Sequence, residues 1–134
     1  MDRLSFHEAH KLICWFPTGE LTSEIIVNYY LAMKACVWGQ EANRFCDFGG
    51  VDNFVLDYNK MQGLVRYRQT TLRNHKDIQL GIYCPNDVGY ALSRMYQMLI
   101  DGFGIETFIA RELGPVAQFL SVPVGLLRFG DADL

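Results

Sequence analysis

The most restrictive feature of this sequence is the alternation of short apolar runs with segments of helical periodicity along almost its whole length. The runs at 12–16, 44–48, 78–83 and 105–109 have the length and composition of buried strands. Strands joined by single helices run parallel, because each crossover returns the chain to the starting edge of the sheet. We therefore predict an α/β fold: a small, mostly parallel sheet of four to five strands with about four helices.

The limits of the helices are indicated by capping residues. The N-cap is Thr22 or Ser23 for the first helix and Asp57 or Asn59 for the second, and 85–87 opens the third. The expected helices cover about 23–37, 58–72, 87–101 and 112–120, and residues 4–6 are expected to pair with 12–16 as an edge hairpin. The third helix has the clearest amphipathic stripe, which we expect to be buried: Val88, Ala91, Leu92, Met95 and Leu99.

Length and composition indicate one domain. The chain has 134 residues, of which 50% are hydrophobic, and no linker or low-complexity run interrupts it. We expect a single α/β domain over 1–121, followed by an apolar C-terminal extension over 122–134.

Charge and cysteine usage exclude several classes of protein. Twelve Lys and Arg residues against fifteen Asp and Glu give a net charge of −3, so no attraction to nucleic acid or to an anionic membrane is expected. No apolar run approaches the ~20 residues of a membrane-spanning helix, and no signal peptide is recognised. The four cysteines are widely spaced and form no C-x-x-C pair. These features predict a cytoplasmic protein without disulfides or a metal site.

The motifs of the common enzyme classes do not occur. The sequence contains no G-x-G-x-x-G or P-loop for phosphates, no G-x-S-x-G and no H-E-x-x-H. His7, His10 and His75 lack an acidic residue in a position to orient them, so we expect them at the surface. We therefore predict a protein that is not an enzyme and that needs no cofactor.

Cys84 is a candidate reactive thiol, because it ends a predicted strand and precedes the N-terminus of a helix, where thiolates are stabilised. A cysteine-dependent phosphatase would add an arginine six residues later, but this position is Tyr90. A buried cysteine at the end of a strand is the preferred interpretation.

Basic residues are concentrated in one segment. Residues 58–76 contain Lys60, Arg66, Arg68, Arg73 and Lys76 and no acidic residue. The second helix thus presents a basic strip on an otherwise acidic protein. A solvated helix surface is the first explanation of such a strip, and among functional uses the docking of an acidic protein partner explains it better than nucleic-acid binding.

Three short motifs, together with the order of the elements, resemble a known family. The motifs are Gly19-Glu20-Leu21-Thr22, the run 45–48 that contains Asp47, and 87–96 in the third helix. They resemble the STAS domain of anti-sigma-factor antagonists, in the SpoIIAA-like branch of small bacterial proteins, over residues 4–121. The resemblance implies a non-enzymatic regulatory or protein-interaction module.

Regulatory members of that family are switched by phosphorylation of a Ser or Thr that follows an Asp at the start of the second helix. Asp57 matches this Asp, but Tyr58 follows it, so the resemblance implies a module without the usual phosphorylation switch. The predicted partner-binding residues lie on the second helix and the loops before it: Asp47, Asp57, Tyr58, Lys60, Arg66 and Arg68.

An alternative function is the binding of a small molecule or a lipid at the carboxyl ends of the strands, near Asp47 and Cys84. The fold is similar to that of lipid-carrying CRAL-TRIO domains. A chain of 134 residues leaves little room for a lipid-sized cavity beside a core.

The C-terminal segment is unusually apolar, and Pro123 and Gly125 indicate an extended path for it. Left in solvent it would promote association. We predict a two-fold homodimer with Leu126, Leu127 and Phe129 at its centre, and docking of the segment on its own domain is the alternative.

Overall fold

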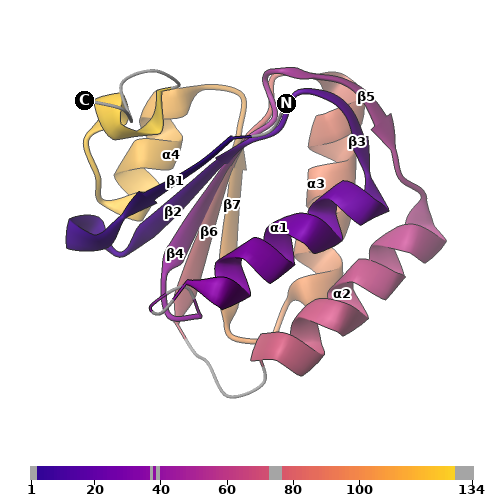
Figure 1. Ribbon diagram of the computed structural model, residues 1–134. Helices are drawn as coiled ribbons and strands as arrows, with labels where there is room; N and C mark the ends of the chain where they lie inside the picture. Colours follow the sequence, from indigo (N-terminus) through magenta and orange to yellow (C-terminus); the bar gives the residue numbers. More distant parts are fainter. Residues whose placement is uncertain (1–2, 37, 39, 73–76, 129–134) are drawn as a thin grey trace.

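The computed structural model describes residues 3–36, 38, 40–72 and 77–128 (Figure 1). Its main sheet has five strands in the order β1-β2-β4-β6-β7. β1 pairs antiparallel with β2, as predicted, and the remaining pairs are parallel. The strands are β1 (Arg3–His7), β2 (Leu12–Phe16), β4 (Asn43–Asp47), β6 (Ile78–Tyr83) and β7 (Ile105–Ala110). The predicted α/β class with a mostly parallel sheet is confirmed.

The helices cover the two faces of this sheet unequally. Three of them lie on one face, and the fourth lies on the other with a short 3-10 helix (Figure 1). From β2 to β7 the strand order advances in one direction, so right-handed crossovers place all three connecting helices on the same face. The helices are α1 (Ser23–Ala35), α2 (Tyr58–Leu72) and α3 (Asp87–Ile100) on the first face, and α4 (Leu113–Leu120) with η2 (Val124–Leu127) on the second; η1 (Glu8–His10) lies in the hairpin.

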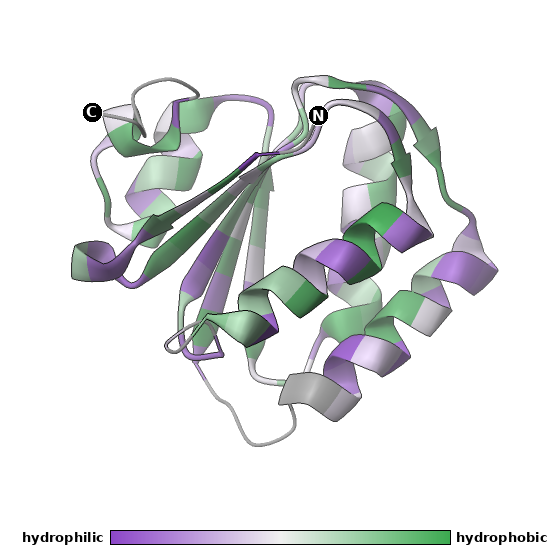
Figure 2. Ribbon diagram, in the orientation of Figure 1, coloured by the Kyte–Doolittle hydropathy of each residue, from purple (hydrophilic) through white to green (hydrophobic). Residues whose placement is uncertain are grey.

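Strand residues alternate between two hydrophobic clusters. Ile13 and Trp15 of β2 belong to the cluster under α1, α2 and α3, whereas Cys14 and Phe16 belong to the cluster under α4. All five residues of β2 are buried, because both faces of this strand are covered. Figure 2 shows hydrophobic residues along β2 and mixed hydropathy along the helices, which bury one side only.

Gly81 lets α4 lie directly on β6. A Cβ atom at this position would lie 2.7 Å from Cγ1 of Val116 and 3.0 Å from Cδ1 of Leu120. Both of these side chains are buried, so they have little room to retreat.

A second, two-stranded sheet was not predicted. β3 (Gly19–Thr22) and β5 (Val51–Val55) pair in parallel and lead into α1 and α2 (Figure 1). Both strands are short and contain polar residues, so they give no buried-strand signal in the sequence. Thr22 also caps α1, where its Oγ1 accepts a hydrogen bond from the backbone N–H of Ile25 at 3.2 Å.

The other helix starts agree with the sequence. Oδ1 of Asp57 accepts a hydrogen bond from the N–H of Lys60 at 2.8 Å, and Oδ1 of Asn86 accepts one from the N–H of Gly89 at 3.0 Å. At its C-terminus α1 ends two residues before the expected limit at Val37, which lies outside the described residues, as does His75.

The predicted apolar stripe of α3 is confirmed only in part. Val88 is 60% exposed and Ala91 is also exposed, whereas Gly89, Ser93 and Ile100 are buried. The small residues face inward because the helix lies close to its neighbours: a Cβ at Gly89 would lie 2.3 Å from Cζ of Phe54. Close packing therefore overrides the hydrophobic pattern, and the rest of the stripe is only half-buried: Leu92, Met95 and Leu99.

The C-terminal segment docks on its own domain as far as the structure describes it. Leu127 has no exposed surface and packs in the cluster with Val116 and Leu120, and Leu126 is half-buried against the same cluster. Leu127 thus fills the core of its own chain, which corrects its placement at the centre of a dimer interface. Phe129 lies outside the described residues. The homodimer itself stays a prediction.

Replacing Leu127 with alanine tests this docking. We expect Leu127→Ala to lower the free energy of unfolding by about 2–5 kcal/mol, the usual loss when a fully buried leucine leaves a cavity. Chemical denaturation measures the change. Leu31→Ala, at a leucine of α1 that is 49% exposed, is the control and should change stability by less than ~1 kcal/mol. Equal small losses in both variants would contradict the docking.

Candidate functional site

A pocket lies between the sheet and the three helices α1, α2 and α3. The volume of the pocket, counted as the space that the centre of a water molecule can occupy, is about 70 Å³. Its side chains come from β2, β3, β4, β6 and β7, from the three helices and from the segment 48–56, which contains β5. Most of the wall is aromatic or aliphatic, and the aromatic part consists of Trp15, Tyr29, Tyr30, Phe48, Phe54 and Tyr96.

Stacked rings form one side of the pocket. The rings of Trp15 and Tyr29 are 4.2 Å apart between centroids and nearly parallel, at 4°. Sγ of Cys46 donates to the hydroxyl oxygen of Tyr29 at 3.9 Å. Burial raises the pKa of Tyr29 and Tyr30 well above the usual value and raises that of Cys46 to about 12. These groups are therefore neutral near pH 7.

Two arginines complete the wall. Arg44 of β4 is 3% exposed and Arg68 of α2 is 4% exposed. Arg44 donates from Nε to Sδ of Met33 at 3.1 Å and from Nη1 to the carbonyl oxygen of Ala42 at 3.0 Å. Cζ of Arg68 lies 4.6 Å from the ring centroid of Tyr30, in a cation–π contact.

The charge of this wall is positive. Burial, and after it the positive charge of Arg68, lower the pKa of Arg44 to about 10, yet the group remains protonated near pH 7. Among the described residues that line the pocket, none is an aspartate or a glutamate. Chemically, the pocket is an apolar space with two guanidinium groups in its wall.

Arg68 is buried, so its predicted place on an exposed docking surface is wrong. Its side chain lies inside the pocket wall, because Met61, Leu64, Val65 and Arg68 form the inward face of α2. A charge reversal there would disturb the core instead of testing a docking surface.

The other predicted partner-binding residues of α2 are exposed. Asp57, Lys60 and Arg66 lie on the surface, and Tyr58 is 51% exposed with its hydroxyl oxygen accepting a bond from Nε2 of Gln62 at 3.0 Å. The basic strip is thus reduced to Lys60 and Arg66 among the described residues, since Arg73 and Lys76 lie outside them. Docking of an acidic partner on α2 stays a prediction.

Asp47 is the last residue of β4, directly before the turn that leads to β5. Its Oδ1 accepts a hydrogen bond from the N–H of Gly49 at 2.8 Å, and its side chain is half-buried. Burial raises the pKa of this carboxyl group, and the bond from Gly49 partly opposes the rise. Because side chains alternate along β4, Asp47 points to the face opposite Cys46 and the pocket.

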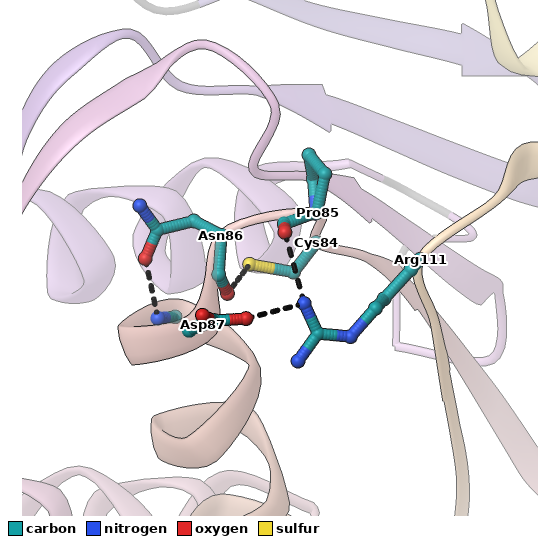
Figure 3. A network of polar contacts seen from close by, with 6 residues as sticks. Cys84, Pro85, Asn86, Asp87 and Arg111 are labelled. Carbon is teal, nitrogen blue, oxygen red and sulfur yellow. Dashed lines mark hydrogen bonds and ion pairs between the residues drawn. The ribbon is translucent and has the colours of Figure 1, made fainter.

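A network of polar contacts joins the carboxyl ends of β6 and β7 (Figure 3). Nη1 of Arg111 donates to the carbonyl oxygen of Pro85 at 3.1 Å and to Oδ1 of Asp87 at 2.7 Å. The Arg111–Asp87 ion pair is largely exposed, so it contributes little to stability. Arg111 also lies over the ring of Tyr90, 4.5 Å from its centroid, and so ties the end of β7 to α3.

Cys84 is fully buried beside this network. Its Sγ donates to the carbonyl oxygen of Asn86 at 3.6 Å (Figure 3). Burial raises the pKa of the thiol, so the interpretation of Cys84 as a buried cysteine at the end of a strand is confirmed.

Arg44 and the pocket were not found from the sequence. The available signal for Arg44 is that it is a charged residue next to Phe45 and Cys46, in a run that otherwise indicates a buried strand. Among the described residues no group of three or more His, Cys, Asp or Glu side chains is placed to hold a metal ion. No described helix has the length and apolar character needed to cross a bilayer.

Comparison of the chain with protein-family models, curated proteins and solved structures gives no significant match. The resemblance to STAS domains therefore rests on the three sequence motifs and the order of the elements.

Asp47 should make stability depend on pH. Its pKa is raised in the folded state, so folding is favoured by protonation, and the free energy of unfolding should fall as pH rises from the ordinary carboxyl pKa through the raised one. Asp47→Asn keeps an acceptor for Gly49 and should remove this part of the decrease. Denaturation curves between about pH 4 and pH 7 measure it. Identical pH profiles of the variant and the parent protein would contradict the prediction.

The cysteines should differ in reactivity. Cys36, which follows α1, is half-buried, whereas Cys14, Cys46 and Cys84 are buried. We expect iodoacetamide near neutral pH to modify Cys36 first, because access and the raised pKa values protect the others. Mass spectrometry of the digested protein reads the order, and denatured protein is the control. Early labelling of Cys84 would show that this thiol is activated.

Proposed function

We propose that this protein is a non-enzymatic binding module that holds a small, mainly apolar molecule between its sheet and helices. The observation that carries the proposal is the pocket of about 70 Å³ with its aromatic wall. Protein interiors are close-packed, with few voids larger than a water molecule, so a space of this size under three helices needs an explanation.

The size of the pocket limits the ligand. One water molecule needs roughly 10–15 Å³ measured in this way, so the pocket has room for about five waters or for one slim organic molecule. A membrane lipid exceeds this space, in agreement with the expectation that so short a chain leaves little room for a lipid-sized cavity. A short aliphatic chain or one aromatic ring suits the dimensions better.

The aromatic wall favours such a molecule over water. Rings provide large flat contact areas and offer few hydrogen bonds to water, so apolar contacts determine binding. Ile26, Phe54, Leu56 and Leu92 are half-buried, and rearrangement of their side chains is the least costly route of entry.

The proposal is compatible with a regulatory role on a STAS-like fold. α2 lines the pocket with Met61, Leu64 and Arg68 and presents Tyr58 and Arg66 to the exterior. A ligand that contacts the inner side of α2 can alter the position of its outer side only if it binds two arrangements of the helix with different affinity. Partner docking on α2 would then depend on the ligand.

A variant that fills the pocket tests the proposal. Ser93 of α3 is buried and lines the pocket, so Ser93→Leu places apolar atoms in the space. We expect toluene or 1-octanol to raise the melting temperature of the parent protein, because binding to the folded state stabilises it, and to lose this effect in Ser93→Leu.

Ala91→Leu is the matched control, because residue 91 lies on the exposed side of the same helix. This variant should respond to the ligands as the parent protein does. Leu92→Phe, at the half-buried margin, serves as a second filling variant if Ser93→Leu unfolds. Equal ligand effects in the filling variants and the control would place binding outside the pocket and refute the proposal.

A further inference from the structure

Ser93 of α3 brings a buried hydroxyl group into the wall of the pocket. The residue is 5% exposed and lines the pocket. Within the part of the chain that the structure describes, Oγ of Ser93 takes part in no hydrogen bond. Thr70 on α2 shows the usual alternative in a helix, since its Oγ1 donates to the carbonyl oxygen of Tyr67 at 2.8 Å. The hydroxyl group of Ser93 is instead available to an occupant of the pocket.

The other polar groups of the wall already interact with one another or with further groups. Cys46 and Tyr29 share the hydrogen bond described above. Burial, and after it the neighbouring Tyr96, raise the pKa of Tyr30, so these two phenol groups lie close together. The two arginines of the wall have partners of their own. A hydroxyl group that leaves water without a new partner costs free energy, so Ser93 is the group that an occupant has to match.

The rings of the wall show both geometries in which aromatic rings pack. Trp15 is stacked on Tyr29, and Phe48 lies perpendicular to Trp15, at 83° with 6.0 Å between the ring centroids. Phe54 is in turn perpendicular to Phe48, at 80° and 6.0 Å. Because ring edges are partly positive and ring faces partly negative, one more ring can join such an arrangement. A saturated molecule of similar size is thicker and forms no contacts of this kind.

We propose that the pocket binds an uncharged aromatic molecule of one ring with a hydroxyl group, a phenol or a benzyl alcohol, whose hydroxyl group forms a hydrogen bond with Oγ of Ser93. This inference rests on the proposed function, to which it adds the chemical class of the ligand. The hydroxyl groups of serine and of the ligand can each donate and accept, so the bond can form in either direction. A single ring with one polar group also suits a volume of about 70 Å³.

Pairs of ligands of equal shape test the hydrogen bond. Phenol is compared with toluene, and benzyl alcohol with ethylbenzene, because the members of each pair differ only in a hydroxyl or a methyl group. Calorimetry near pH 7 measures the dissociation constants for the parent protein and for Ser93→Ala, which places a good helix former at this position. We expect Ser93→Ala to raise the dissociation constant of phenol or benzyl alcohol about threefold to tenfold, the contribution of one hydrogen bond. The constant of the matched hydrocarbon should change less than about twofold, because a hydrocarbon forms no such bond.

Ser5→Ala is the matched control. Ser5 is also buried, at 8% exposed, but it lies opposite Cys14, which belongs to the cluster under α4. This variant should leave each dissociation constant unchanged. Ser93→Cys introduces a weaker hydrogen-bonding group of similar size, so it should weaken the same two ligands and serves if Ser93→Ala unfolds. Cyclohexanol tests the ring, and we expect it to bind at least about threefold more weakly than phenol.

The outcomes separate this inference from the proposed function. If neither these compounds nor 1-octanol bind, or if binding survives in Ser93→Leu, the proposed function fails and the inference fails with it. If Ser93→Leu abolishes binding but Ser93→Ala affects alcohols and hydrocarbons equally, the pocket is a binding site and the inference is wrong. An equal loss in Ser5→Ala, or equal affinity for cyclohexanol and phenol, also overturns the inference.

Discussion

Both faces of the main sheet are apolar, and the arrangement of the chain follows from the need to cover each of them. Three crossovers in one direction supply α1, α2 and α3 to one face. They leave the other face bare, and the segment after β7 covers it. Gly81 allows α4 to approach β6, and Leu127 then fills the remaining space beside Val116 and Leu120. The same division separates a close-packed half under α4 from a half that encloses a pocket.

Much of the fold could be predicted from sequence, because its determinants are local. β6 coincides with the expected strand, and Thr22, Asp57 and Asn86 begin helices as capping residues do. The parts that could not be predicted depend on distant neighbours. β3 and β5 are strands because they pair with each other, and the inward side of α3 is determined by the closeness of Phe54 to Gly89. The place of the C-terminal segment against α4 cannot be inferred from the sequence either, because it depends on the finished fold.

The candidate site could be predicted least well, because its two arginines lie in segments of the sequence that indicate other structural roles. Arg68 lies in a basic segment, which predicts a position on the surface, and Arg44 lies within a run that indicates a strand. The residue type does not predict burial at either position, because arginine is usually exposed. Local rules agree with the fold at most positions of this chain, so two cations in an apolar core are a departure of the kind that binding sites produce.

The position of Leu127 has a consequence for folding of the chain during its synthesis on the ribosome. Chains are synthesised from the N-terminus, and all five strands of the main sheet precede α4 and η2. The apolar residues Cys14, Phe16 and Phe45 therefore have no cover on their side until residues 116–127 have left the ribosome. During this interval one face of a nearly complete sheet is open to solvent and to chaperones, while the opposite face, with its pocket, already has all of its helices.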